Sequence, residues 1–306
     1  MSSAVTRSFL FFAILMGALT GLSVPRTEAA GTSALLRQAI GERIVIAGRQ
    51  RMLAEGMAAK LCLSYSGVES EANSRELYMM WNIFRWYHAS LRTGNIELGL
   101  SIEANPDVLR AWREIDQVWG GLSGFYEEAL DNGGVDPLTF QLAMDLTGTV
   151  TDGASNLVAT LRSAYAEELG PRGFGNALLI DLYERQRMLA QKISKDVCLI
   201  AQGDQSEARR TNLIETAGIF AASLDAFQNG LSDVGVPPPP SAEIAGDLAE
   251  ARRHWQPIAG LVATASLGQS PSPKQMAGFA AEMDLFIASM TGAINALTRL
   301  TTGAQQ

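Results

Sequence analysis

Apolar residues recur along this chain every three or four positions, which is the spacing of one face of an α-helix. Leu53, Met57 and Leu61 are one such series. Alternation with a period of two, the mark of a half-exposed strand, is hard to find anywhere. The pattern predicts eight helices, at residues 34–66, 75–92, 107–130, 137–169, 177–201, 206–228, 241–265 and 273–301.

Glycine and proline divide these helices. Asn105-Pro106 is a start signal for the third helix, and Gly170-Pro171 is expected to end the fourth. A polyproline run, residues 237–240, connects the sixth and seventh. Four amphipathic helices with short connections form an antiparallel four-helix bundle, so the expected fold is all-α with two tandem bundles.

One phrase occurs twice, and both copies lie at matching places in a longer duplication. The letters RQRMLA stand at residues 49–54 and again at 185–190, 136 positions later. Phe84 and Phe220, among other pairs, keep the same spacing. A period this long indicates two whole domains, not an array of small repeats. The boundaries expected are 1–29 for a signal peptide, 30–170 for the first bundle and 171–306 for the second.

The first 29 residues differ in character from the rest. Arg7 precedes an apolar run, residues 9–24. Thr27 and Ala29 then place small residues at positions −3 and −1 of a cleavage site after Ala29. This is the pattern of a secretory signal cleaved near Ala29, because the run is short for a membrane span. The alternative is a retained N-terminal anchor. Export to the periplasm is the expectation.

The net charge of the chain is −8. An acidic chain gains no long-range attraction to nucleic acid or to anionic lipid. A site for an anion would therefore have to be local, made by a few arginines.

The duplicated motif resembles a known family. Residues 46–54, IAGRQRMLA, look like the signature of the type IV pilus methyl-accepting chemotaxis transducer N-terminal domain, the PilJ-type domain. Residues 184–192 keep its core, with Tyr183-Glu184 where the first copy has Ala47-Gly48. The resemblance implies a periplasmic, helical, non-enzymatic sensory domain. It also implies similarity to nitrate/nitrite sensor kinases, in which an arginine followed by Met binds the anion across a dimer. That arginine corresponds to Arg51 and Arg187.

Arg51 and Arg187 share helix faces with small residues, such as Ala58 and Cys62 in the first copy, which let another helix approach closely. Two facing guanidinium groups can surround one small oxyanion and repel each other without it. The alternative is an ordinary salt-bridged arginine, with Glu55 one turn from Arg51 as a partner.

Arg49 and Arg185 lie on another stripe, among the apolar residues of each first helix. They are weaker ligand candidates. We expect each to lay its stem along the core and pair with a carboxylate, and Asp145 and Asp284 on the fourth helix of each copy are the duplicated candidates.

Cys62 and Cys198 are the only cysteines, and an exported chain with two cysteines usually joins them. If the two first helices lie parallel, Arg51 meets Arg187 at one level and the cysteines meet at another, since eleven residues are about three turns. End-to-end bundles would leave the thiols too far apart to bridge. A buried free cysteine in each copy is the other alternative.

No other chemistry stands out. His88 and His254 do not correspond between the copies, and neither a metal motif nor a nucleophile–base motif is present, so we expect no cofactor and no enzyme. The predicted function is a sensory protein that binds a small nitrate- or nitrite-like anion and signals to a membrane sensor, transporter or pilus component. The alternative is a structural adaptor on a pilus or envelope complex that binds no small molecule.

Overall fold

A computed structural model describes residues 26–302, and side chains from residue 35 to residue 300 apart from those of residues 172 and 234. Within this range the chain is all-α, with eight long helices, one short 3-10 helix and no strand. The helices are α1 (Arg26–Tyr65), α2 (Ser70–Thr93), α3 (Pro106–Asn132), α4 (Pro137–Ala164), α5 (Ala166–Ala201), α6 (Glu207–Asn229), η1 (Ser232–Val234), α7 (Ala242–Ser266) and α8 (Pro273–Thr302).

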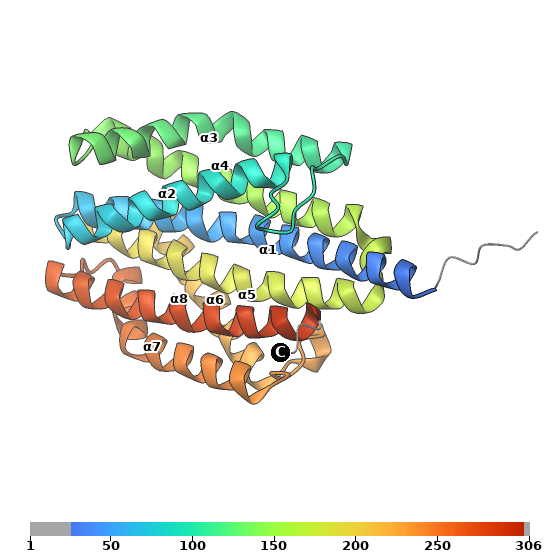
Figure 1. Ribbon diagram of the computed structural model, residues 1–306. Coiled ribbons are helices and arrows are strands. Elements are labelled where there is room, and N and C mark those ends of the chain that lie inside the picture. Colours follow the sequence, from blue (N-terminus) through green and yellow to red (C-terminus); the bar gives the residue numbers. More distant parts are fainter. Residues whose placement is uncertain (1–25, 303–306) are drawn as a thin grey trace, which may run out of the picture.

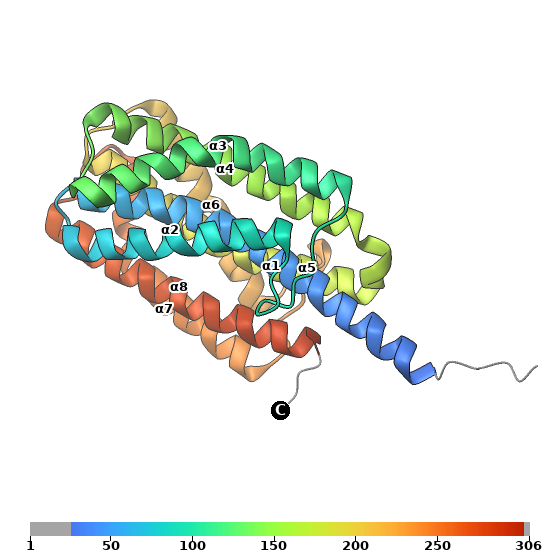
Figure 2. The same ribbon diagram turned by 45° about the horizontal axis from the view of Figure 1, so that its top comes forward.

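The helices pack as two four-helix units that lie side by side. Helices α1–α4 contact one another in one unit, and α5–α8 contact one another in the other. Helices α1 and α5 form the main contact between the units, in the centre of the molecule (Figures 1 and 2). They run in the same direction, because Arg49 contacts Glu184 near one end and Cys62 contacts Cys198 near the other. This is the side-by-side arrangement, not the end-to-end one.

The helix starts follow the local sequence. The side chain of Asn105 accepts from the backbone N–H groups of Asp107 and Val108, and that of Asp136 caps α4 in the same way. Proline occupies the first position of both helices, where its missing N–H is not needed. The residues that mark the starts of these helices in the sequence thus cap them in the structure.

The junction between the units differs from the expectation. The fourth helix ends at Ala164, not at 169, and α5 begins at Ala166, not at 177. Gly170 (φ 65°, ψ 174°) makes a kink inside α5, and Pro171 follows it. A proline at the start of a helical segment is tolerated, so Gly170-Pro171 bends the chain instead of separating two helices by a loop.

Both units carry the same local features 136 positions apart. A single bridge joins Asn95 and Leu100, and another joins Leu231 and Val236. In the cores, the rings of Phe84 and Trp119 lie 4.0 Å apart, and those of Phe220 and Trp255 lie 4.4 Å apart. The two units thus share local structure at positions that correspond in the duplication.

The predicted signal segment lies almost entirely outside the described residues, and α1 runs through the predicted cleavage position. Helix α8 is long and apolar enough to cross a membrane by length and composition alone. It packs against α7 and α5, with Phe279, Phe286 and Ile294 in the core. Core helices of bundles have the same length and composition, so the apolar character of α8 is consistent with its packing in the second unit.

Candidate functional site

Helices α1 and α5 meet through small residues and one covalent bond. Ala47, Ala58 and Ala190 are completely buried in this seam, as the small-residue stripes predicted. Cys62 and Cys198 form a disulfide, with Cα atoms 6.2 Å apart, within the usual range for such a bond. The disulfide clamp expected from the sequence is therefore present in the structure.

Charged side chains occupy the same seam. Arg51, only 4% exposed, reaches from α1 to α5 and donates from Nη2 to the carboxylate of Asp181. The other oxygen of Asp181 accepts from Arg162 Nη1 of α4 at 2.8 Å. One carboxylate thus holds two guanidinium groups, and the Nε of Arg162 is buried without a hydrogen-bond partner in the described part of the chain.

Glu184, like Asp181, binds two arginines with one carboxylate. It is completely buried, and its two oxygens accept from different arginines. Arg49 of α1 donates from Nε to Oε1 at 3.3 Å, and Arg187 donates to Oε2 at 2.8 Å. The hydroxyl of Tyr87 on α2 also accepts from Arg49, at 3.1 Å. Burial disfavours the charge of Arg49, but Glu184 and Tyr87 outweigh it and raise its pKa.

The carboxylate partners predicted for the motif arginines were wrong. Asp284 binds Lys60 of α1 at 2.9 Å, and Asp145 accepts from Gln141 at 2.8 Å. Glu55 does not pair with Arg51. Its carboxylate lies 2.7 Å from Lys195 and accepts from Thr151 at 3.0 Å. The acidic residues that do bind the arginines lie on α5 itself: Glu184 directly before the second motif and Asp181 one turn before it.

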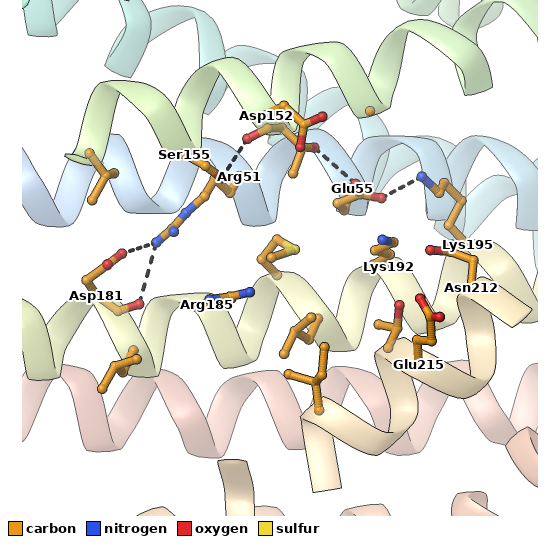
Figure 3. Close-up of a pocket in the computed structure, with 18 of the residues that line it drawn as sticks. Arg51, Glu55, Asp152, Ser155, Asp181, Arg185, Lys192, Lys195, Asn212 and Glu215 are labelled. Carbon is orange, nitrogen blue, oxygen red and sulfur yellow. Dashed lines mark hydrogen bonds and ion pairs between the residues drawn. The ribbon is translucent and has the colours of Figure 1, made fainter. Parts of the chain in front are cut away.

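A groove of about 840 Å³ runs along α5 between α4 and α6. Arg51 and Asp181 lie at one end, and Arg185 lies next to them (Figure 3). Arg162, which donates to Asp181, also lines the groove. The lining does not include Arg49 or Arg187. Of the four arginines predicted from the motif, the structure thus brings Arg51 and Arg185 to one groove and leaves the other two on Glu184.

Arg185 is the exception to the expectation of a buried, paired arginine. Its residue is exposed, and among the residues described it has no hydrogen bond or ion pair. Lys192, two turns further along the same face of α5, is likewise without a partner in the described range. Both line the groove. Two cations without carboxylate partners beside a buried arginine form an anion-attracting surface.

The far end of the groove is more nearly neutral. Lys195 is held by Glu55, and Arg209 by Asp196 at 2.7 Å. Burial raises the pKa of Asp196, against the lowering effect of Lys195 and Arg209. The acidic residues Asp145, Asp152 and Glu215 also line the groove. The positive charges without a partner in the described chain are therefore those of Arg185 and Lys192, both on the α5 side of the groove.

The histidines are structural in this arrangement. His88 is buried between Gln50 and Asp116, and its ring stacks on Trp112 at 4.5 Å. Burial lowers its pKa to about 4, although Asp116 acts in the opposite direction. His254 lies 2.8 Å from Glu282. No group of three or more metal-binding side chains occurs within the described residues.

The sequence reading missed Asp181, Glu184 and Arg162 as members of the site. A signal for the first two existed. They stand where the first copy has Val45 and Gly48, so an acidic residue replaces an apolar or small one at a duplicated position. Arg162 lies on another helix, and only the packing of α4 on the seam places it near Asp181.

A comparison with protein families agrees with the motif. Residues 179–278 match the family described as the type IV pili methyl-accepting chemotaxis transducer N-terminal domain, PilJ. This stretch is a PilJ domain. It covers most of α5, all of α6 and α7 and the start of α8, and includes Arg185 and Lys192. The PilJ family is sensory and typically non-catalytic, and no catalytic family matches the chain. No curated protein and no solved structure matches it.

Proposed function

We propose that this chain is a periplasmic, non-enzymatic sensory protein in which a small oxyanion, nitrate- or nitrite-like, binds on the groove side of the α1–α5 seam. The PilJ domain supports the sensory role. The buried disulfide between the units supports an oxidising compartment, because such bonds are rare in the cytosol. The predicted signal segment agrees with that location.

One observation carries the choice of site. Arg185 lines the groove without a partner in the described chain, beside Arg51 and Arg162, which share a single carboxylate. Because Arg51 and Arg162 share one carboxylate and Arg185 has none, these three guanidinium groups leave positive charge for a guest anion. A planar guanidinium offers fixed donors that match the geometry of an oxyanion.

The duplication explains why one chain has one such site. We propose that residues 30–170 are a second, divergent copy of the PilJ-type unit, so that the chain reproduces internally a pair of domains. In that pairing Glu184 neutralises Arg49 and Arg187, whereas the corresponding Gly48 leaves Arg185 free. The shared site thus becomes one-sided, with Arg51 and Arg185 in place of Arg51 and Arg187.

Signalling would pass through the seam to a membrane-bound sensor, transporter or pilus component. Arg51 joins α1 to α5, and Arg162 joins α4 to α5, so an anion that competes for these groups changes contacts between the two units. Small shifts of packed helices at such an interface are a common way for helical sensors to respond.

Calorimetric titration of the exported chain with nitrate, nitrite, sulfate and phosphate tests the proposal. Saturable binding that Arg185→Gln weakens at least tenfold is the expected result. Arg110→Gln, which removes an exposed arginine of α3 far from the groove, is the matched control and should bind as the unmodified chain does. An absence of heat with every anion would favour the structural adaptor.

A further inference from the structure

An apolar pocket of about 250 Å³ opens between α5 and α6 beside Arg185. Its walls include Leu182, Leu189, Ile219 and Phe227. Arg185 belongs to the lining of both this pocket and the charged groove. A cation without a partner in the described chain therefore stands at the edge of an apolar space.

Aromatic residues stand at the corresponding positions of the first unit. Ala222 and Ser223 line the pocket, and Trp86 and Tyr87 stand 136 positions earlier. The hydroxyl of Tyr87 accepts from Arg49, which corresponds to Arg185. The rings of Trp86 and Tyr87 stack with centroids 5.3 Å apart. In the first unit, an aromatic ring that carries a hydroxyl oxygen thus binds the arginine. The second unit has no aromatic residue at this position.

We infer that the pocket of the second unit binds a small aromatic anion, such as an aromatic carboxylate. Its ring takes the place that Tyr87 fills in the first unit, and its carboxylate binds Arg185. This inference rests on the proposed function and names the class of ligand, an organic anion in preference to an inorganic one. Nitrate can meet Arg185 but leaves the apolar pocket empty.

The dimensions and the chemistry of the pocket agree with one ring. An apolar protein cavity of about 150 Å³ holds benzene, so about 250 Å³ has room for a single substituted ring. Burial of a ring-sized apolar surface strengthens binding by roughly 10- to 100-fold over an anion without it. The fit of the ring and its apolar burial therefore favour benzoate over acetate, which carries the same charge.

The test is calorimetric titration of the full chain with benzoate, acetate and nitrate at constant ionic strength. We expect benzoate to bind with one site per chain and roughly 10- to 100-fold more tightly than acetate. The double variant Ala222→Trp, Ser223→Tyr copies the first unit and should abolish the preference for benzoate, because its own rings fill the pocket. Ala221→Tyr adds an aromatic residue at a neighbouring exposed position of α6 outside the pocket lining, and should leave the preference unchanged.

A second variant keeps the test decisive if the double variant does not fold. Arg185→Gln removes the cation and keeps the pocket, and should weaken benzoate binding at least tenfold. Benzoate binding that survives in the folded double variant overturns the inference. Equal affinity for benzoate and acetate, with Arg185-dependent binding of nitrate, overturns the inference and leaves the proposed function standing. Failure of all three anions to bind overturns both.

Discussion

Arg51 of α1 is bound to Asp181 of α5, so a buried ion pair crosses from one four-helix unit to the other. The same carboxylate holds Arg162 at 2.8 Å. In the proposed site, Asp181 neutralises part of the positive charge that would otherwise attract an anion. If an anion binds at this site, as we propose, Asp181 competes with it for the two arginines.

Asp181→Asn should therefore tighten anion binding while it destabilises the fold. The amide keeps the size of the side chain but removes its charge, so Arg51 and Arg162 both become available to a guest. Loss of a partly buried charge pair costs about 1 to 3 kcal/mol in unfolding free energy. Titration and urea unfolding of the same variant measure the two effects. Weaker anion binding in a folded Asp181→Asn variant would show that the carboxylate orients the arginines instead of competing.

The four motif arginines should separate into two classes when their charge is removed. Arg187→Met leaves Glu184, completely buried, with Arg49 alone, and should cost about 2 to 4 kcal/mol. Arg185→Met removes no ion pair and should change stability by about 0.5 kcal/mol or less. Urea unfolding compares the free energies of unfolding of the two variants, both of which replace an arginine of α5 with methionine. Similar losses at both positions would mean that Arg185 has a stabilising role the groove geometry does not provide.

The disulfide should contribute strongly to stability, because it closes a loop of 136 residues. Cys62→Ser with Cys198→Ser is expected to lower the unfolding free energy by about 2 to 5 kcal/mol, since the open chain regains conformational freedom when unfolded. Thiol titration of denatured, unreduced protein should first show no free thiol. Two free thiols, or a double serine variant as stable as the parent, would contradict the clamp.

Stability should fall in mild acid because of His88. Its pKa is about 4 in the folded chain and about 6.5 when unfolded, so the unfolded state binds more protons between these values. Stability from this residue is complete above about pH 6.5 and is lost as the pH falls towards 4. The loss is about 3 kcal/mol. His88→Gln should flatten this part of the pH profile, and a profile that is equally steep in the variant would assign the effect to other groups.

Much of the fold was predictable, because helix periodicity, caps and the 136-residue spacing are all local or repeated signals. The positions of Cys62 and Cys198 also indicated the parallel seam, and the structure bears out that geometry. The junction was harder. Gly170-Pro171 resembles a helix stop, but a proline at the start of the next helical segment only kinks the chain.

The site was less predictable, because its partners come from other helices. Asp145 and Asp284 were chosen by their repeat position, whereas the packing brings Asp181 and Glu184 to the arginines. Arg185 lacks the two partners of Arg49, because Gly48 and Ser223 stand where the other copy has Glu184 and Tyr87. Periodicity gives the face of a helix, but not the side chains that another helix sets against it.

The most direct test of the central claim, that an anion binds at Arg185, is to follow the arginine Nε–H signals by NMR during titration with nitrate and with benzoate. The Arg185→Gln variant assigns the signal of that residue. The account predicts a saturable shift of the Arg185 signal, while the signal of exposed Arg110 stays unchanged. An Arg185 signal that does not move, or that moves linearly together with the signals of all exposed arginines, would contradict it.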